Sequence, residues 1–181
     1  KPMPHYQIVE EHALYFVPFS VVEWLPVFVA EEPCQIVSES LNFCHGKKHL
    51  RINAYVVMPT HIHAILFDED FDSSRLRQTV TALRKFTGRQ LVDYCHSRVP
   101  ASFSAAVRNA AGRDREHRFW QDDVHPEAIY TQGFWRQKFD YLHENPCRKG
   151  LVCEPSHWRF SSAAYWVEGA ESDVLLTAVE W

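Results

Sequence analysis

The amino-acid sequence predicts an α+β fold of the ferredoxin-like type, with helices packed on a mainly antiparallel sheet. Segments with strand and helix character follow in the order strand, helix, hairpin, helix, strand, helix. A hydrophobic share of 46% with only six glycines is typical of a globular chain. A length of 181 residues fits one core, so we expect a single domain over residues 1–181.

The first half of the chain predicts three strands and a helix. Residues 13–24 are rich in Val, Phe and Tyr, which favours a strand. A weak helical pattern covers about residues 33–45. Residues 50–58 and 61–67 follow as strands, and only Pro59-Thr60 separates them, which predicts a hairpin.

A long helix is predicted next. Ser73 or Ser74 can cap it, and its apolar positions keep helical spacing to about Tyr94. Residues 97–118 contain a proline, small residues and many arginines, and we expect a flexible basic loop there.

The last third is expected to close the core. Residues 119–124 are predicted as a short strand, and residues 128–130 followed by 134–144 as helix, stopped by Pro146. Aromatic residues gather again in residues 158–166, and we expect this cluster to complete the core.

The charge is unevenly distributed along the chain. The net charge is −4, yet residues 73–118 carry ten basic and three acidic side chains, which gives +7 there and −11 elsewhere. Such a segment is expected where one face meets phosphates, although a solvated helix surface would look the same.

Other classes of protein are disfavoured. No apolar run reaches the ~18 residues that a membrane helix requires, so we expect a soluble, cytoplasmic protein. Five widely spaced cysteines without a CxxC pair argue against a disulfide framework. A zinc cluster of Cys44, His45 and His49 is disfavoured because a second cysteine pair at finger spacing is missing.

Two stretches carry candidate chemistry. His61 and His63 are two residues apart on a predicted strand, so both face the same side, about 6.5–7 Å apart at the backbone. They could hold a divalent cation or a phosphate, or be core histidines. Tyr141 and Asn145 are four residues apart on one helix face, where they could supply a nucleophile and a hard-metal ligand. Alternatively, they are a buried aromatic and a helix cap. His143 points away from that face.

Together these stretches resemble the HUH single-strand transposases, most closely the REP-associated tyrosine transposases. The resemblance covers about residues 51–166 and rests on NAYVVMPTHIHAILF, RFWQDDVHPEAIY, YLHENPCRKGLV and HWRFSSAAYW, which occur in that order. It implies that Tyr141 is a nucleophile that forms a 5′-phosphotyrosine intermediate. It also implies that His61, His63 and Asn145 hold Mg²⁺ or Mn²⁺, which acts as a Lewis acid.

The same resemblance implies single-stranded DNA with hairpins (REP-like sequences) as the partner. The residues expected to contact DNA are Arg84, Lys85, Arg89, Arg148, Lys149, Trp120 and Gln121. Trp120 could stack on an extruded base or be part of the core. The protein would act as a monomer or homodimer.

Two alternatives remain at this point. The chain could be a catalytically inactive DNA hairpin-binding protein of the same fold, although the presence of His61, His63 and Tyr141 disfavours this. It could also be a phosphoesterase with paired His-x-Thr/Ser motifs, but the sequence has one HxH, followed by Ala64.

Overall fold

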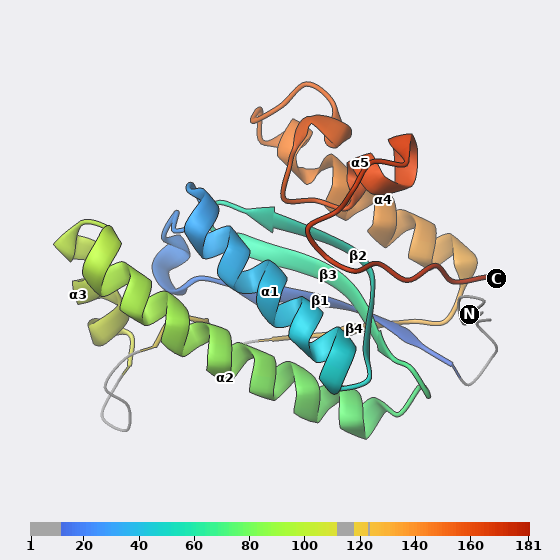
Figure 1. Ribbon diagram of the computed structural model, residues 1–181, viewed down its shortest axis with the longest axis horizontal. Coiled ribbons are helices and arrows are strands. Elements are labelled where there is room, and N and C mark those ends of the chain that lie inside the picture. Colours follow the sequence, from blue (N-terminus) through green and yellow to red (C-terminus); the bar gives the residue numbers. More distant parts are fainter. Residues whose placement is uncertain (1–11, 112–117, 123) are drawn as a thin grey trace.

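The computed structural model describes residues 12–111, 118–122 and 124–181 (Figure 1). This part of the chain forms a four-stranded antiparallel sheet in the order β2-β3-β1-β4. The strands are β1 (Leu14–Ser20), β2 (Leu50–Met58), β3 (His61–Asp68) and β4 (Glu127–Ile129). With a helix after β1 and another after β3, this is the ferredoxin-like order, and the predicted fold class is confirmed.

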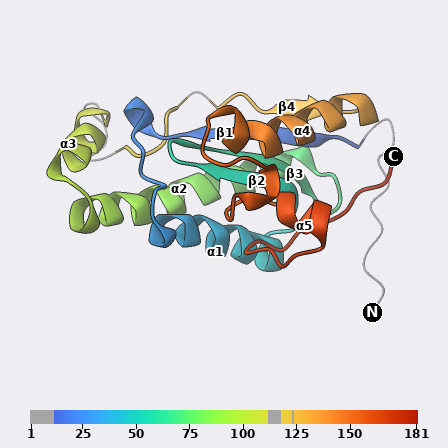
Figure 2. The ribbon, with the colours of Figure 1, turned by 90° about the horizontal axis from the view of Figure 1, so that it is seen from above.

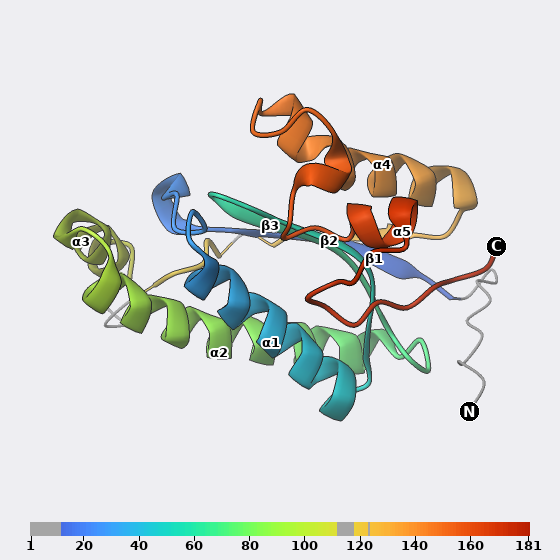
Figure 3. The ribbon, with the colours of Figure 1, turned by 45° about the horizontal axis from the view of Figure 1, so that its top comes forward.

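Helices cover both faces of the sheet. They are α1 (Glu31–Lys47), α2 (Ser73–Arg98), α3 (Ala101–Asn109), α4 (Gln132–Arg148) and α5 (Ala163–Glu168), with short 3₁₀ turns η1 (Val22–Trp24) and η2 (Pro155–His157). α1 and α2 lie on one face, and α4 and α5 on the other (Figure 3). α3 lies at the far end of α2, away from the C-terminus (Figure 2). Within the described residues, none of these helices combines the length and apolarity required to cross a membrane.

Alternation along β3 divides the buried side chains into two cores. Ile62, Ala64 and Leu66 pack in the core beneath α1 and α2, whereas Ile65 and Phe67 pack in the core beneath α4. Successive strand residues point to opposite faces, so the two histidines at the start of β3 share the α4 face. The predicted hairpin therefore places His61 and His63 on the face of the sheet that α4 covers.

The C-terminal segment covers the exposed edge of β2. The backbone N–H of Val57 donates to the Phe160 carbonyl at 2.8 Å, and that of Ser162 donates to the Tyr55 carbonyl at 3.0 Å. The Trp158 indole N–H donates to the Val57 carbonyl at 2.9 Å. An unpaired edge would otherwise invite aggregation, so the aromatic tail both closes the core and protects the sheet.

Several predicted boundaries were wrong in the first half. The first strand ends at Ser20, because the chain turns sharply at Glu23 and Trp24, which both have positive φ. The cap of α2 is Asp72 and not either serine, since its carboxylate accepts the Arg75 backbone N–H at 2.9 Å.

The predicted loop over residues 97–118 was wrong in part, because residues 101–109 form α3. Val107 is fully buried, and the Ser104 hydroxyl donates to the Cys95 carbonyl at 2.9 Å. These tertiary contacts stabilise a helix of nine residues that would be marginal alone. Residues 112–117 of the expected loop lie outside the described residues.

Two predictions near α4 were also wrong. Residues 127–129 form β4, with Ile129 paired to Leu14 and buried, where a helix was expected. Thr131 separates this strand from α4, since its hydroxyl accepts the Phe134 backbone N–H at 3.3 Å. α4 continues past Pro146 to Arg148. Residues 119–122 run alongside η1 with one isolated bridge between Val21 and Trp120, and are not a full strand.

Candidate active site

The two histidines of β3 lie side by side under α4. Their ring centroids are 4.7 Å apart, at a steep interplanar angle of 67°. His61 Nδ1 lies 2.9 Å from the Thr60 hydroxyl, which leaves Nε2 to face α4. His63 Nδ1 is buried and has no hydrogen-bond partner among the described residues. A buried ring nitrogen of this kind, with its lone pair unused by the protein, fits a metal ligand.

α4 brings Tyr141 and Asn145 onto the histidine pair. The Nδ2 atom of the Asn145 amide lies 3.3 Å from His61 Nε2. The Tyr141 ring centroid lies 5.7 Å from that of His63, and Tyr141 is 44% exposed. The i, i+4 spacing on one helix turn therefore places a buried amide and an exposed phenol at the same two imidazoles.

Both imidazoles are held in the neutral form. Burial, with a smaller effect of the Lys149 charge, lowers the pKa of His61 to about 4. Burial lowers the pKa of His63 to about 3, helped by the charges of His61, Lys138 and Arg148. Neutral imidazoles keep a lone pair, which is the form that binds metal ions.

The donor set fits a hard or borderline divalent cation. It offers two neutral imidazoles and the Asn145 amide. The amide points its Nδ2 at His61, and with the amide turned over its carbonyl oxygen would be the ligand atom for Mg²⁺ or Mn²⁺. A second group, with ligand atoms within 4.8 Å of one another, consists of His49, Glu69 and Asp70. Its two carboxylates already pair with arginines, so it is the weaker candidate. The zinc alternative fails because Cys44 is buried in the core and is not part of this group.

His143 faces the opposite side of α4, as expected. It is buried, and its Nε2 lies 2.6 Å from the Ser162 hydroxyl. That hydroxyl also accepts the Tyr55 backbone N–H at 2.9 Å, so the contact ties α4 to the β2 edge.

Arg148 and Lys149 end α4 next to the site. The Arg148 guanidinium lies over the Tyr141 ring, 4.4 Å from its centroid, and also donates to the Tyr141 carbonyl. Both residues are exposed, and both contribute positive charge that the two imidazoles experience.

The remaining basic candidates line a groove between α2 and residues 118–122. The groove has a volume of about 790 Å³, and its lining includes Arg84, Lys85, Arg89 and Arg118. Arg84 also donates to the Gln121 carbonyl, so it holds the groove together as well as lining it. Gln121 in turn donates its side-chain amide to the Val21 carbonyl at 2.9 Å.

Trp120 is a core residue in this structure. It is 6% exposed, its indole N–H donates to the Thr87 hydroxyl at 3.1 Å, and its ring stacks on Phe28. Of the two interpretations that the sequence left open, burial favours the core, because an enclosed indole has no free face for a base.

The sequence missed two neighbours of His61. Thr60 fixes the orientation of its ring, and its position directly before the HxH pair was the available signal. Trp24 lies edge-on to the same ring, with centroids 6.1 Å apart. Trp24 had no signal in the sequence, because residues 13–24 were predicted to form one strand.

No protein-family model matches the chain. The REP-associated tyrosine transposase of Escherichia coli (strain K12) is 30% identical over 115 residues, which cover 61% of this chain and 53% of that protein. The chain is similar to a REP-associated tyrosine transposase. The matched residues span only about half of that relative's length.

A solved structure of a REP-associated tyrosine transposase bound to a REP hairpin has the same fold. The TM-score is 0.57 at 20% sequence identity, over 100% of this chain and 94% of that chain. The resemblance that the sequence motifs indicated is thereby confirmed, and the fold similarity extends to the N-terminal part for which no motif was recognised.

Proposed function

We propose that this chain is a metal-dependent single-stranded DNA endonuclease and strand transferase of the HUH type, with Tyr141 as its nucleophile. The observation that carries the proposal is the convergence of Tyr141 and Asn145 from α4 on His61 and His63 from β3. Each stretch alone can be explained by core packing or helix capping. An exposed phenol next to two neutral imidazoles and an amide is instead the arrangement expected of a metal-dependent tyrosine nuclease.

The site residues have two proposed roles, metal binding and nucleophilic attack. His61, His63 and Asn145 would hold Mg²⁺ or Mn²⁺, which when bound supplies Lewis-acid polarisation of the scissile phosphate. The Tyr141 hydroxyl gives up its proton as its oxygen attacks phosphorus, the bond from phosphorus to the 3′ oxygen breaks, and that oxygen takes up a proton and leaves as a 3′-hydroxyl. The phosphodiester bond in DNA is replaced by a phosphodiester bond to tyrosine, so its energy is kept. The 3′-hydroxyl of another DNA end can therefore attack the phosphotyrosine and rejoin the strand without ATP.

Arg148 contacts the proposed nucleophile directly. Arg148 lies over one face of the Tyr141 ring and donates to the Tyr141 backbone carbonyl. Its guanidinium, with Lys149, also supplies positive charge for the DNA backbone next to the site.

Hairpin-bearing single-stranded DNA is the partner that we propose. The relative of known structure binds a REP hairpin, and this chain has the same fold. The groove offers the exposed Lys85 and Arg89 as phosphate contacts on a chain whose net charge is negative, whereas Arg118 pairs with Asp122.

The test is incubation with labelled single-stranded hairpin oligonucleotides and Mn²⁺, followed by a denaturing gel. We expect a covalent protein–DNA adduct that is absent with EDTA and in Tyr141→Phe. Tyr130→Phe is the matched control, since Tyr130 is also exposed (54%) but lies outside the site. Salt-sensitive binding without any adduct would instead identify an inactive hairpin-binding protein.

A further inference from the structure

Trp24 presents an exposed indole beside the candidate metal ligands. It is 56% exposed, whereas Trp120 is 6% exposed. Its ring lies edge-on to His61, with centroids 6.1 Å apart. A large apolar ring left in water next to a candidate catalytic centre points to a ligand with a flat aromatic face.

The backbone holds this indole in an unusual conformation. Glu23 and Trp24 have φ of 53° and 54°, in the left-handed region, which is strained for residues other than glycine. Hydrogen bonds fix the turn. The Trp24 N–H donates to the Val21 carbonyl at 3.0 Å, and the Val21 N–H donates to the Thr60 carbonyl at 3.0 Å. Because Thr60 directly precedes the histidine pair, the indole is fixed relative to that pair, and strain of this kind is typical of functional sites.

The order of contacts along β1 shows on which side Trp24 lies. Near the start of this strand, the Phe16 ring lies 6.1 Å from the Tyr141 ring. At its end, Ser20 is paired in register with the first histidine of the pair, and Trp24 follows beyond Ser20. Tyr141 and Trp24 therefore flank the histidine pair from opposite sides.

We propose that Trp24 stacks on the nucleobase on the 5′ side of the scissile phosphate. The inference rests on the proposed function. In an in-line displacement, the attacking and leaving oxygens lie on opposite sides of phosphorus. Tyr141 attacks from one side, so the nucleotide that leaves with the 3′-hydroxyl lies toward Trp24. Stacking on an aromatic side chain tolerates any base, so Trp24 holds this nucleotide without reading its identity.

The experiment uses hairpin oligonucleotides with 2-aminopurine at successive positions around the bond that the wild-type protein cleaves in Mn²⁺. Binding is measured with Tyr141→Phe, which leaves the strand intact. We expect the fluorescence of 2-aminopurine to be quenched at the position 5′ of the bond. Adding Trp24→Ala should abolish this quenching and weaken binding about tenfold. Trp24→Phe should retain most of the quenching, because it keeps an aromatic face, whereas Trp24→Leu should not.

Phe43→Ala is the matched control, because Phe43 is 59% exposed and belongs to α1, on the other face of the sheet. Cleavage by the wild-type protein without Trp24-dependent quenching at the 5′ position would overturn this inference and leave the proposed function intact. If the wild-type protein forms no adduct, the proposed function fails, and the assignment of Trp24 to a scissile position fails with it.

Discussion

At the scale of single residues, two tryptophans show how environment decides a role. Trp24 lies in a stretch rich in apolar residues, and Trp120 follows an aromatic neighbour in the sequence. The first is exposed beside His61, and the second is enclosed with its N–H bonded to Thr87. The sequence left Trp120 open as a base contact or a core residue and gave Trp24 no role, and only burial separates the exposed indole from the enclosed one.

The core role of Trp120 predicts the effect of Thr87→Val. Valine has the shape of threonine but cannot accept the indole N–H, so a buried donor loses its partner. We expect a loss of about 1–3 kcal/mol in the free energy of unfolding, measured by urea denaturation. Thr81→Val, at an exposed position of α2, is the control and should change stability by less than about 0.5 kcal/mol. Equal stability of both variants would show that the indole hydrogen bond does not hold Trp120 in the core.

The position of Asn145 predicts a change in metal requirement. If its amide oxygen is a ligand, Asn145→Ala should raise the Mn²⁺ concentration for half-maximal adduct formation by about tenfold or more. Asn145→Asp keeps the size and offers a carboxylate oxygen, so it should stay close to the wild-type requirement. The measurement is a Mn²⁺ titration of adduct yield. An unchanged midpoint in Asn145→Ala would remove Asn145 from the ligand set.

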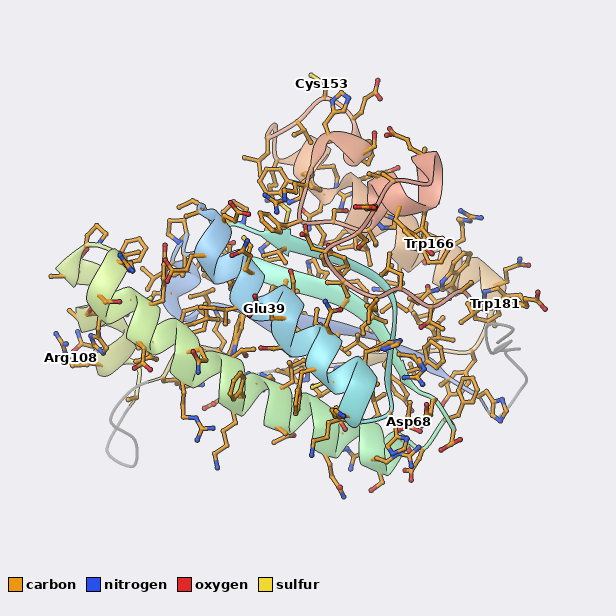
Figure 4. All side chains as sticks on the ribbon, in the orientation of Figure 1. Glu39, Asp68, Arg108, Cys153, Trp166 and Trp181 are labelled. Carbon is orange, nitrogen blue, oxygen red and sulfur yellow. The ribbon has the colours of Figure 1, made fainter. Side chains whose placement is uncertain are left out.

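At the scale of elements, the junction between β3 and α2 depends on one buried carboxylate. Asp68 lies where the sheet meets the start of α2 (Figure 4). Its two oxygens accept from Arg75 Nε and Nη2 at 2.7 and 2.6 Å, and Oδ1 also accepts the backbone N–H groups of Asp70 and Asp72. Burial works to raise the pKa of Asp68, but these hydrogen bonds outweigh it and hold the pKa below its usual value.

Asp68→Asn should therefore destabilise the fold in a pH-dependent way. A depressed carboxyl pKa stabilises the folded state fully above about pH 4, and this stabilisation is lost as the pH falls through the depressed pKa. We expect a loss of about 2–3 kcal/mol at pH 7, and a weaker dependence of stability on pH below 4 than in the wild type. Urea denaturation at several pH values measures both.

Asp70→Asn is the control for this prediction, because Asp70 also pairs with Arg75 but its side chain is 71% exposed. Exposed ion pairs contribute little, so stability should change by less than about 1 kcal/mol. If both variants lose the same stability at every pH, the buried carboxylate is not the group that secures the junction.

Elements with strong local patterns were predicted well. The hairpin of β2 and β3 follows from two apolar runs and a Pro-Thr break, and its bounds differ by one residue at most. β4 and α3 were missed because they depend on contacts with other elements of the fold. The three residues of β4 have no period of their own and pair with β1. α3 is fixed by contacts such as that of Ser104 with α2.

At the scale of the whole molecule, many of the basic side chains of this acidic chain lie in one region. The net charge is −4, but the described part of the basic segment forms α2 and α3, and Arg118 at its end lines the groove. Arg108 marks the α3 end of this region in Figure 4. Such a field attracts a polyanion to one region while the rest of the surface repels it.

This charge distribution predicts how binding depends on salt. Arg89→Ala should weaken binding of hairpin DNA by a similar factor for different sequences, and should reduce the slope of log affinity against log salt by about 0.7–0.9. Fluorescence anisotropy over a range of salt concentrations measures both. Lys47→Ala, at an exposed position of α1 outside the groove, should leave the slope unchanged. A slope that falls equally in both variants would mean that the groove is not the phosphate-binding surface.

The sequence by itself determined the α+β class, the central hairpin and the residue types of the candidate site. These follow from local patterns: period-2 alternation, helix spacing, and pairs two or four residues apart. Tertiary structure decided which of those residues meet, since the distance of 3.3 Å between Asn145 and His61 joins positions 84 apart in the chain. It also decided which of the two tryptophans is exposed and which is buried. Burial and proximity between distant segments are properties of the packed chain, and no local pattern encodes them.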